Sequence, residues 1–471
     1  MIEHFIYMLP LLILLFGSTI FACKKFAADD TPQCFKLCRL IIAVSFAFSI
    51  IFYNRPMLIG LSAANHLTSI LLSWLFVNVF IILYLARKWF NSIKQSGDYF
   101  CSGIIFATIA GCLLIISKNI VLTAGAVILL MAVNIRMLQK YRESMQNLQF
   151  KNVYTKSALW LMIMLLAATA KLYFQAGSGD YEIVQNMLHE KQSDFITFGA
   201  SCILVLAFMF LLAAAPLHYW LIYTAAKMSL PILIYFLLLV PTVAFACLIR
   251  LDMLMLSTLS GSLQILYCAI GFMSVFVGAV GACASVNIRQ MLAYTLVFFV
   301  GIDFIILQHF TLDAVQTAIV YCFFCWLALC GICITLFCFK NKGEYLLQFD
   351  QFANAAYKKP CAALIMTLLF FSLLGLPPLT GSLGLFAVLN ELAAHNCFYS
   401  LIYVLLMLLI LSYSYLNVMQ KMYFENSRNN FDRTGFDIYI LLFAIVAVMI
   451  FVALQPHYLI GNLWMAEIFY G

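Results

Sequence analysis

Charged residues are scarce in this 471-residue sequence: Lys, Arg, Asp and Glu together make up only 10% of it, while 65% of the residues are hydrophobic. Soluble domains are typically about one-quarter charged and about one-half apolar. So few charges cannot cover a soluble protein of this length, which excludes a soluble enzyme, and the composition equally excludes a disordered, fibrous or disulfide-stapled secreted chain. We therefore predict an all-α polytopic membrane protein.

The sequence also lacks recognisable metal, nucleotide and nucleic-acid motifs. Most of its 16 cysteines lie within apolar runs such as 322–333, and their spacing, without nearby histidines, does not fit a zinc site. The net charge of +7 is too thinly spread for a surface that follows a nucleic-acid backbone. No phosphate loop, Ser-His-Asp set or haem attachment motif is present. We therefore expect no metal, no nucleic acid and no catalytic residue on this chain.

Long apolar runs, in contrast, are abundant. A helix needs about 20 mostly apolar residues to cross about 30 Å of hydrocarbon. The first run lacks a basic region before it and is followed by Lys24 and Lys25, so we interpret it as a retained span rather than a signal peptide. A shorter amphipathic segment, 217–229, separates the seventh span from the eighth. The fourteen candidate spans are 5–22, 38–54, 67–86, 101–117, 119–135, 157–175, 195–215, 231–250, 256–282, 291–309, 314–339, 360–376, 398–420 and 436–454.

The distribution of basic residues supports this count of spans. Of the 26 Lys and Arg residues, Lys171 lies inside a span, and the loops after even-numbered spans hold only Arg55, Lys118, Lys191 and Arg250. All the others follow odd-numbered spans, which by the positive-inside rule places those loops on the cytoplasmic or matrix side. We predict that both termini face the opposite side, which is called the outer side below.

Proline interrupts two of the predicted spans. Span seven ends in AAAPLHYW with Pro216, and span twelve continues into FSLLGLPPLTGSLGLF with Pro377 and Pro378. Proline removes a backbone donor and clashes with the carbonyl four residues earlier, so each helix is expected to break there. Matched breaks in the two halves of a chain are typical of internal repeats with ion sites at the broken helices, whereas two unrelated kinks are the alternative.

Five ionisable residues are candidates for a proton path, because a charge at membrane depth is costly and usually functional. Lys171, near the end of span six, could relay protons or extend to the interface, and we favour the second. His218, beside the break in span seven, could relay protons or cap the helix end. Asp303 and Glu391 lie in the outer parts of spans ten and twelve, where partial solvation is the simpler explanation. Lys227 is expected at the inner membrane surface.

Four motifs resemble those of a known family. They are APLHYW at 215–220, NIRQMLAYT at 287–295, FSLLGLPPLTG at 371–381 and SYSYLNVMQKMYFE at 412–425. In order, spacing and membrane side they are similar to the motifs of the antiporter-like subunits of respiratory complex I, the NADH:quinone oxidoreductase, and in particular to its subunit 2. The resemblance covers most of residues 110–425, while the first hundred residues match by hydrophobic pattern only.

The resemblance implies an architecture of about 14 transmembrane helices containing two inverted five-helix repeats, with helices 7 and 12 broken. We expect one antiporter-like membrane domain over 1–471. Its parts are three N-terminal helices in 1–100, a first repeat in 101–250, a second repeat in 256–420, and a C-terminal helix and tail in 436–471.

The family's proposed proton path requires one glutamate and three lysines at mid-membrane, and this sequence departs from that pattern at all four positions. The glutamate falls at Asn134 and the lysines at Leu211, Pro241 and Leu385. Neither leucine nor proline can bind or pass on a proton. Without the four charges, the family's charged residues can no longer change one another's pKa. We expect a subunit that keeps the fold while its standard proton channel is lost.

The resemblance further implies a role in an assembly that oxidises NADH, reduces a quinone such as ubiquinone and moves protons. NADH, FMN, iron–sulfur clusters and quinone would all be on other subunits. The expected partners are a small neighbouring spanning subunit, another antiporter-like subunit and lipids such as cardiolipin. The expected location is the mitochondrial inner membrane, with a bacterial plasma membrane as the alternative. A subunit of the subunit 4 type, a cation/proton antiporter subunit and a stand-alone secondary transporter remain alternative functions.

Overall fold

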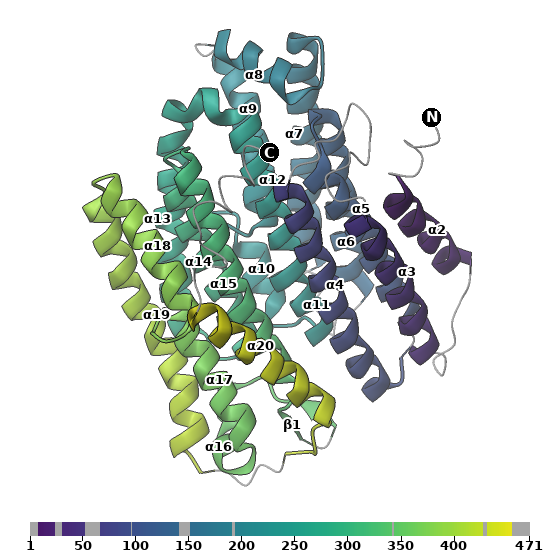
Figure 1. The fold of residues 1–471 in the computed structure, drawn as a ribbon, viewed down its shortest axis with the longest axis vertical. Helices are drawn as coiled ribbons and strands as arrows, with labels where there is room; N and C mark the ends of the chain where they lie inside the picture. The colour runs from purple at the N-terminus through teal and green to yellow at the C-terminus, as the bar shows by residue number, and fades with distance from the viewer. Residues whose placement is uncertain are drawn as a thin grey trace. The chain divides into compact units, whose positions relative to one another are not determined.

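The computed structural model describes residues 8–23, 31–51, 66–95, 97–140, 151–190, 194–341, 343–426 and 431–454, and these residues are predominantly helical (Figure 1). They group into two compact units. The first unit contains the chain up to Leu212 together with Lys227–Ser260, and the second contains Ala213–Ala226 and the residues from Gly261 onward. The division after Ser260 lies a few residues inside the second predicted repeat, 256–420, and Ala213–Ala226 of the first predicted repeat belongs to the second unit. That the repeats form one domain stays a prediction, and the predicted tail after Leu454 lies outside the described residues.

The first unit is built from membrane-length helices and several shorter pieces. Its elements are α2 (Leu9–Cys23), α3 (Thr31–Ile51), α4 (His66–Ile93), α5 (Asp98–Ile116), α6 (Ile120–Lys140), α7 (Lys151–Ala176), α8 (Tyr181–Glu190), α9 (Phe195–Leu211), α11 (Leu230–Ile234), the π-helical turn η3 (Tyr235–Leu239), α12 (Val240–Leu254) and the 3₁₀ turn η4 (Leu256–Leu259).

The second unit has the same character, with a small antiparallel hairpin added. Its elements are α10 (Tyr219–Ala225), α13 (Ser260–Ala284), α14 (Ile288–Leu307), α15 (Leu312–Leu336), β1 (Lys340–Asn341), β2 (Glu344–Tyr345), the 3₁₀ turn η5 (Phe349–Phe352), α16 (Ala355–Lys358), α17 (Pro360–Leu373), α18 (Thr380–Ala394), α19 (Phe398–Phe424) and α20 (Phe436–Leu454). In the hairpin, Lys340 pairs with Tyr345.

The predicted spans correspond to helices throughout the described residues. Eleven helical segments are long and apolar enough to cross a membrane, and four shorter apolar helices accompany them. Each of the fourteen predicted runs falls on one of these segments, except that span twelve covers α17 while α18 supplies a second half that had not been assigned as a helix. The prediction of an all-α polytopic membrane protein is confirmed.

Both predicted helix breaks are confirmed. The helix of span seven ends at Leu211 and resumes with α10 at Tyr219, and Pro216 lies between them. The helix of span twelve ends at Leu373 and resumes at Thr380, with Pro377 and Pro378 between. Each predicted repeat therefore contains one interrupted helix, as expected from proline chemistry.

Side chains close the ends of several helices. Asp194 accepts a hydrogen bond from the backbone N–H of Ile196 at the start of α9. Asn287 accepts from the N–H of Gln290 at the start of α14, at 2.9 Å, and Thr311 accepts from the N–H of Ala314 at the start of α15, at 3.1 Å. These N-caps satisfy donors that would otherwise be left unpaired where each helix begins.

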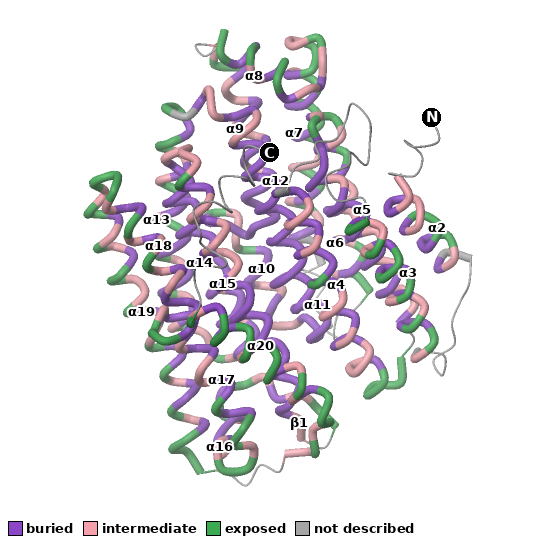
Figure 2. The backbone as a smooth tube through the Cα atoms, in the orientation of Figure 1, coloured by how far each residue is buried: buried purple, intermediate pink, exposed green. Residues whose placement is uncertain are grey.

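The backbone of α12 in the first unit is coloured almost entirely as buried in Figure 2. The residues from Leu230 to Asp252 are all buried, and α12 packs against α4, α5 and α9 of the same unit. By contrast, most of α19 and α20 is exposed or half-buried, which is typical of helices that face lipid or a neighbouring protein. In the second unit, α13 and α14 approach closely, since a Cβ on Gly278 would lie 2.6 Å from the backbone nitrogen of Phe298. Such small residues allow membrane helices to pack at short range.

Candidate functional site

Asn134, the residue predicted to replace the family's glutamate, lies in a neutral polar cluster in the first unit. Asn134 on α6 is fully buried, and its Oδ1 accepts a hydrogen bond of 2.6 Å from the hydroxyl of Tyr235. The hydroxyl of Tyr154 on α7 also interacts with the Asn134 side chain. We call these three residues the Asn134 cluster. Its groups can exchange hydrogen bonds but carry no charge.

Tyr235 is the first residue of a π-helical turn that ends two residues before Pro241. Proline has no N–H, so the carbonyl of Leu237 loses its usual helical partner. The chain forms the π-helical turn Tyr235–Leu239 directly before this point, and π turns inside α-helices often mark functional positions. The residue that replaces a family lysine thus coincides with a local change in helix geometry. A proline in place of a cation also leaves this part of the first unit uncharged.

The other two family positions are also occupied by apolar side chains. Leu211, the last residue of α9, is 1% exposed. Leu385 on α18 is half-buried and lies in the second unit, where a Cβ on Gly375 would come within 2.6 Å of it. None of the four residues predicted to occupy the family's charged positions is therefore ionisable. A relay of the family type has no charged member at these positions.

Lys171 lies near an acidic group at the outer end of the first unit. Its charge acts on Asp194, which caps α9. The pKa of the Asp194 carboxyl is lowered chiefly by the hydrogen bond from the Thr197 hydroxyl and also by hydrogen bonds from Gln175 and from the backbone N–H of Ile196, with a further contribution from Lys171. The position of Lys171 near a surface carboxylate is compatible with an interfacial lysine.

The break in span seven holds His218 at the first turn of α10. The backbone carbonyl of His218 accepts hydrogen bonds from Leu221 and Ile222, but its side chain makes no capping hydrogen bond, so the expectation that the imidazole caps the helix is wrong. Its Nδ1 is buried and has no hydrogen-bond partner among the described residues. At the same break, the backbone N–H of Ala215 donates a hydrogen bond to Ser274 Oγ on α13, at 2.8 Å.

Lys227 is half-buried in the turn after α10.

Asp303 is the most deeply buried acidic residue of the second unit described by the structure. It lies on α14, is only 3% exposed, and its Oδ1 has no hydrogen-bond partner in the described part of the chain. The partial solvation expected for Asp303 is therefore wrong. The neighbouring groups on α15, namely the Tyr321 hydroxyl and the thiols of Cys322 and Cys325, lie within electrostatic range of its carboxyl. All three are uncharged polar groups.

A second polar pair lies beyond Tyr321. Tyr415 on α19 is fully buried, and its hydroxyl donates to Thr295 Oγ1 on α14 at 3.0 Å. The Tyr415 ring stacks on Phe370 of α17, with the ring centroids 4.9 Å apart. Tyr321 interacts electrostatically with both Asp303 and Tyr415. The side chains of α14, α15 and α19 thus form a series of polar groups within an apolar interior.

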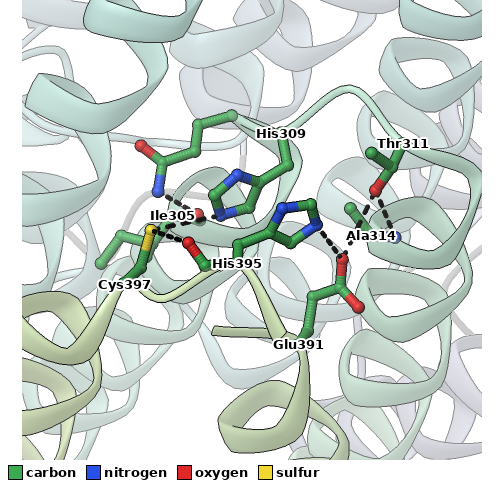
Figure 3. A network of polar contacts seen from close by, with 8 residues as sticks. Ile305, His309, Thr311, Ala314, Glu391, His395 and Cys397 are labelled. Carbon is green, nitrogen blue, oxygen red and sulfur yellow. Dashed lines mark hydrogen bonds and ion pairs between the residues drawn. The ribbon is translucent and has the colours of Figure 1, made fainter. Parts of the chain in front are cut away.

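An outer cluster of five side chains occupies the far ends of these helices (Figure 3). Glu391 on α18 pairs with His395 one turn later, at 3.1 Å between Oε1 and Nε2, and accepts a weaker hydrogen bond from Thr311 at 3.4 Å. The rings of His395 and His309 are stacked, with centroids 4.0 Å apart, and Cys397 Sγ lies 3.9 Å from His309 Nε2. Glu391 is 8% exposed, so partial solvation is also wrong for this residue. We call this group the outer cluster.

Burial changes the pKa of one member of the outer cluster, His309. The pKa of His309, which lies in the loop after α14, is lowered to about 4 because burial disfavours its charged form and because His395 is a nearby base that repels a second positive charge. Across the described residues, no group of three or more His, Cys, Asp or Glu side chains is arranged to hold a metal ion.

Comparison with known proteins identifies the class. A family model described as "NADH:quinone oxidoreductase/Mrp antiporter, TM" matches residues 119–412, which is more than half of the chain, and the chain belongs to this family.

Particular relatives agree with the family model. The chain is 25% identical to NADH-quinone oxidoreductase subunit N from Francisella tularensis subsp. holarctica over 403 residues, covering 82% of this chain and 80% of the relative. It resembles a chain of respiratory complex I from Thermus thermophilus with a TM-score of 0.79, 18% identity, and coverage of 95% of this chain and 97% of that one. It also resembles a chain of the Mrp complex from Dietzia with a TM-score of 0.82 and 13% identity, covering 99% of this chain and 96% of that one. The two structural likenesses establish the shared fold.

The sequence pointed to only part of the two sites. It singled out Asn134, Asp303 and Glu391, but the structure separates Asn134, in the first unit, from the other two, in the second. It missed Tyr235, Tyr321, His309 and His395. The two histidines lie just beyond helix ends, in the segments QHF and AHN. The available signal for them was that each of two predicted spans has a histidine at its outer end.

Proposed function

We propose that this chain is a core membrane-arm subunit of a proton-pumping NADH:quinone oxidoreductase, of the subunit 2 type, whose standard proton relay is absent. The assignment to subunit 2 is supported by the relative from Francisella, which is named subunit N, a close variant of that type. The observation that carries the loss of the relay is the neutral Asn134 cluster at the position where the family has a glutamate. Leu211, Pro241 and Leu385 remove the remaining charges.

Within that assembly the chain would have no redox chemistry of its own. NADH oxidation and quinone reduction would take place on other subunits, with their FMN and iron–sulfur clusters. The chain would contact a small spanning subunit, another antiporter-like subunit and membrane lipids such as cardiolipin. The expected location was the mitochondrial inner membrane, but the relative named above is bacterial. A bacterial plasma membrane is therefore the better supported location.

Assembly is tested first on a native gel. Solubilised membranes from cells that carry a tagged chain are separated, and NADH oxidation is stained in the gel. Co-migration of the chain with a very large NADH-oxidising band supports the proposal. Migration as a small oligomer without this activity would instead support the antiporter or stand-alone transporter alternatives, for which the likeness to the Mrp complex is the favouring observation.

The absent relay is tested by substitution at Asn134. In a relay of the family type, the residue at this position would carry protons, so Asn134→Leu would lower the number of protons pumped per NADH oxidised. We expect instead no change in that ratio for Asn134→Leu and for the polar control Asn134→Gln, in assemblies that oxidise NADH normally. A fall confined to Asn134→Leu would show that the Asn134 cluster transfers protons and would reject the proposal.

A further inference from the structure

Asp303 is a buried acid, and no cation is found beside its carboxyl group among the residues that the structure describes. Moving an isolated carboxylate out of water costs far more than moving the neutral acid, so a buried acid normally has a partner or holds its proton. The groups that face Asp303 on α15 are a hydroxyl and two thiols, and none of them is a cation. A carboxyl group in such a site is expected to hold its proton.

The surroundings of Asp303 place it close to the position of a lost family lysine. Tyr321 interacts electrostatically with Asp303 and packs against α18, where a Cβ on Gly384 would lie 3.3 Å from its ring. Gly384 directly precedes Leu385, which occupies the lysine position. In the second unit, Tyr321 therefore lies between the carboxyl group of Asp303 and Leu385, the residue at the position of the missing lysine.

Polar groups continue from Asp303 toward the outer side. Asp303 is four residues from Leu307, where α14 ends, which is a distance of about 6 Å along the helix axis. The loop that follows contains His309, and Glu391 and His395 of the outer cluster lie at the end of α18 (Figure 3). In the opposite direction, Tyr321 leads to the hydrogen-bonded pair of Tyr415 and Thr295.

We propose that Asp303 is a protonatable site that replaces the missing lysine of span twelve and exchanges protons with the outer side through Glu391, His395 and His309. The number of protons on Asp303 is the same before and after each exchange. One proton leaves the Asp303 carboxyl group for the outer cluster, and one proton returns to the carboxylate from the interior through Tyr321. The role in pumping rests on the proposed function, whereas the protonation of Asp303 does not.

Infrared spectroscopy tests the protonation directly. The intact assembly is compared with one that carries Asp303→Asn, which has nearly the same shape and cannot hold an acid proton. We expect the C=O stretch of one protonated carboxylic acid to be lost in Asp303→Asn, to shift in Asp303→Glu, and to be unchanged in Asp313→Asn. Asp313, at the exposed start of α15, is the matched control. A carboxylic-acid region in Asp303→Asn identical to that of the unaltered protein would show that Asp303 is ionised and would overturn the proposal.

Proton transfer is tested in the same variants after reconstitution into vesicles. We expect Asp303→Asn and Tyr321→Phe to lower the number of protons moved per NADH oxidised, and Asp303→Glu to restore part of it, while Asp313→Asn has no effect. Loss of the infrared band without any change in this ratio would overturn the transfer step. If the chain does not co-migrate with the NADH-oxidising band, the proposed function is rejected. The infrared experiment then still tests whether Asp303 is protonated.

Discussion

At the scale of single residues, the hydrogen bond between Asn134 and Tyr235 is a neutral substitute for a charged site. Both residues are fully buried, so removing either one leaves a polar atom of the other in an apolar interior. We expect Asn134→Leu and Tyr235→Phe each to lower the free energy of unfolding in detergent by about 1–2 kcal/mol. The double variant is expected to lose about 1 kcal/mol less than the two single losses combined, because the pair is then removed together. Fully additive losses would show that the two side chains are not coupled.

His309 gives the outer cluster a pH dependence with a defined sign. An imidazole in the unfolded chain has a pKa of about 6.5, whereas that of folded His309 is about 4. Between these values the unfolded state binds more protons, so stability is complete above about pH 6.5 and falls as the pH is lowered toward about 4. The groups that face His309 are His395, which pairs with Glu391, and Cys397.

We therefore expect the melting temperature of the unaltered protein to fall more steeply over this pH range than that of His309→Gln. The exposed His189 on α8 provides the control, since His189→Gln is expected to retain the steep fall. Melting curves recorded at several pH values in detergent measure both. Parallel curves for the unaltered protein and His309→Gln would contradict the assignment.

At the scale of elements, the break between α17 and α18 depends on one glycine. A Cβ on Gly381 would lie only 1.7 Å from the backbone carbonyl oxygen of Ser372, so a side chain cannot be accepted unless the two half-helices move apart. The backbone N–H of Gly381 also donates to Ser372 Oγ at 3.2 Å. We expect Gly381→Ala to lower the free energy of unfolding by about 3 kcal/mol, measured by denaturation in detergent.

The control for this substitution is Gly261 on α13, in the same unit. A Cβ there meets no atom within 4 Å, and alanine favours a helix over glycine by about 1 kcal/mol, so Gly261→Ala is expected to be neutral or slightly stabilising. If Gly381→Ala were as well tolerated as Gly261→Ala, the close packing of the two half-helices would be refuted.

The sequence predicted those elements whose position depends on nearby residues alone. Apolar length and proline chemistry are local properties, so the spans and the breaks at Pro216 and Pro377 could be predicted. The second half-helix, Thr380–Ala394, was missed because a proline pair marks where a helix stops and gives no sign of where the next one starts. The π-helical turn Tyr235–Leu239 depends on packing around Pro241 as well as on the proline itself, and no pattern in the sequence indicated it.

At the scale of the whole molecule, the candidate site was harder to predict than the fold. The sequence could show that four family charges are missing, because that is a comparison of residue types. It could not show that Asp303 is buried, since burial depends on how α14 packs against its neighbours α13 and α15, and no local pattern in the sequence specifies that packing. The stacked pair of His309 and His395 likewise forms only when α14 and α18 end at the same place.

The orientation of the whole chain in the membrane is set by its basic loops, and two cysteines can report on it. Cys361 is exposed in the first turn of α17, beside Lys358 and Lys359, which places it on the cytoplasmic or matrix side. Cys397 is half-buried at the start of α19, and the broken helix of α17 and α18 separates it from Cys361. We expect a membrane-impermeant maleimide to modify Cys361 only in inside-out vesicles and Cys397 only in right-side-out vesicles, with mass spectrometry identifying each peptide. Cys361→Ser serves as the control for assignment, and modification of both cysteines from the same side would contradict a crossing between them.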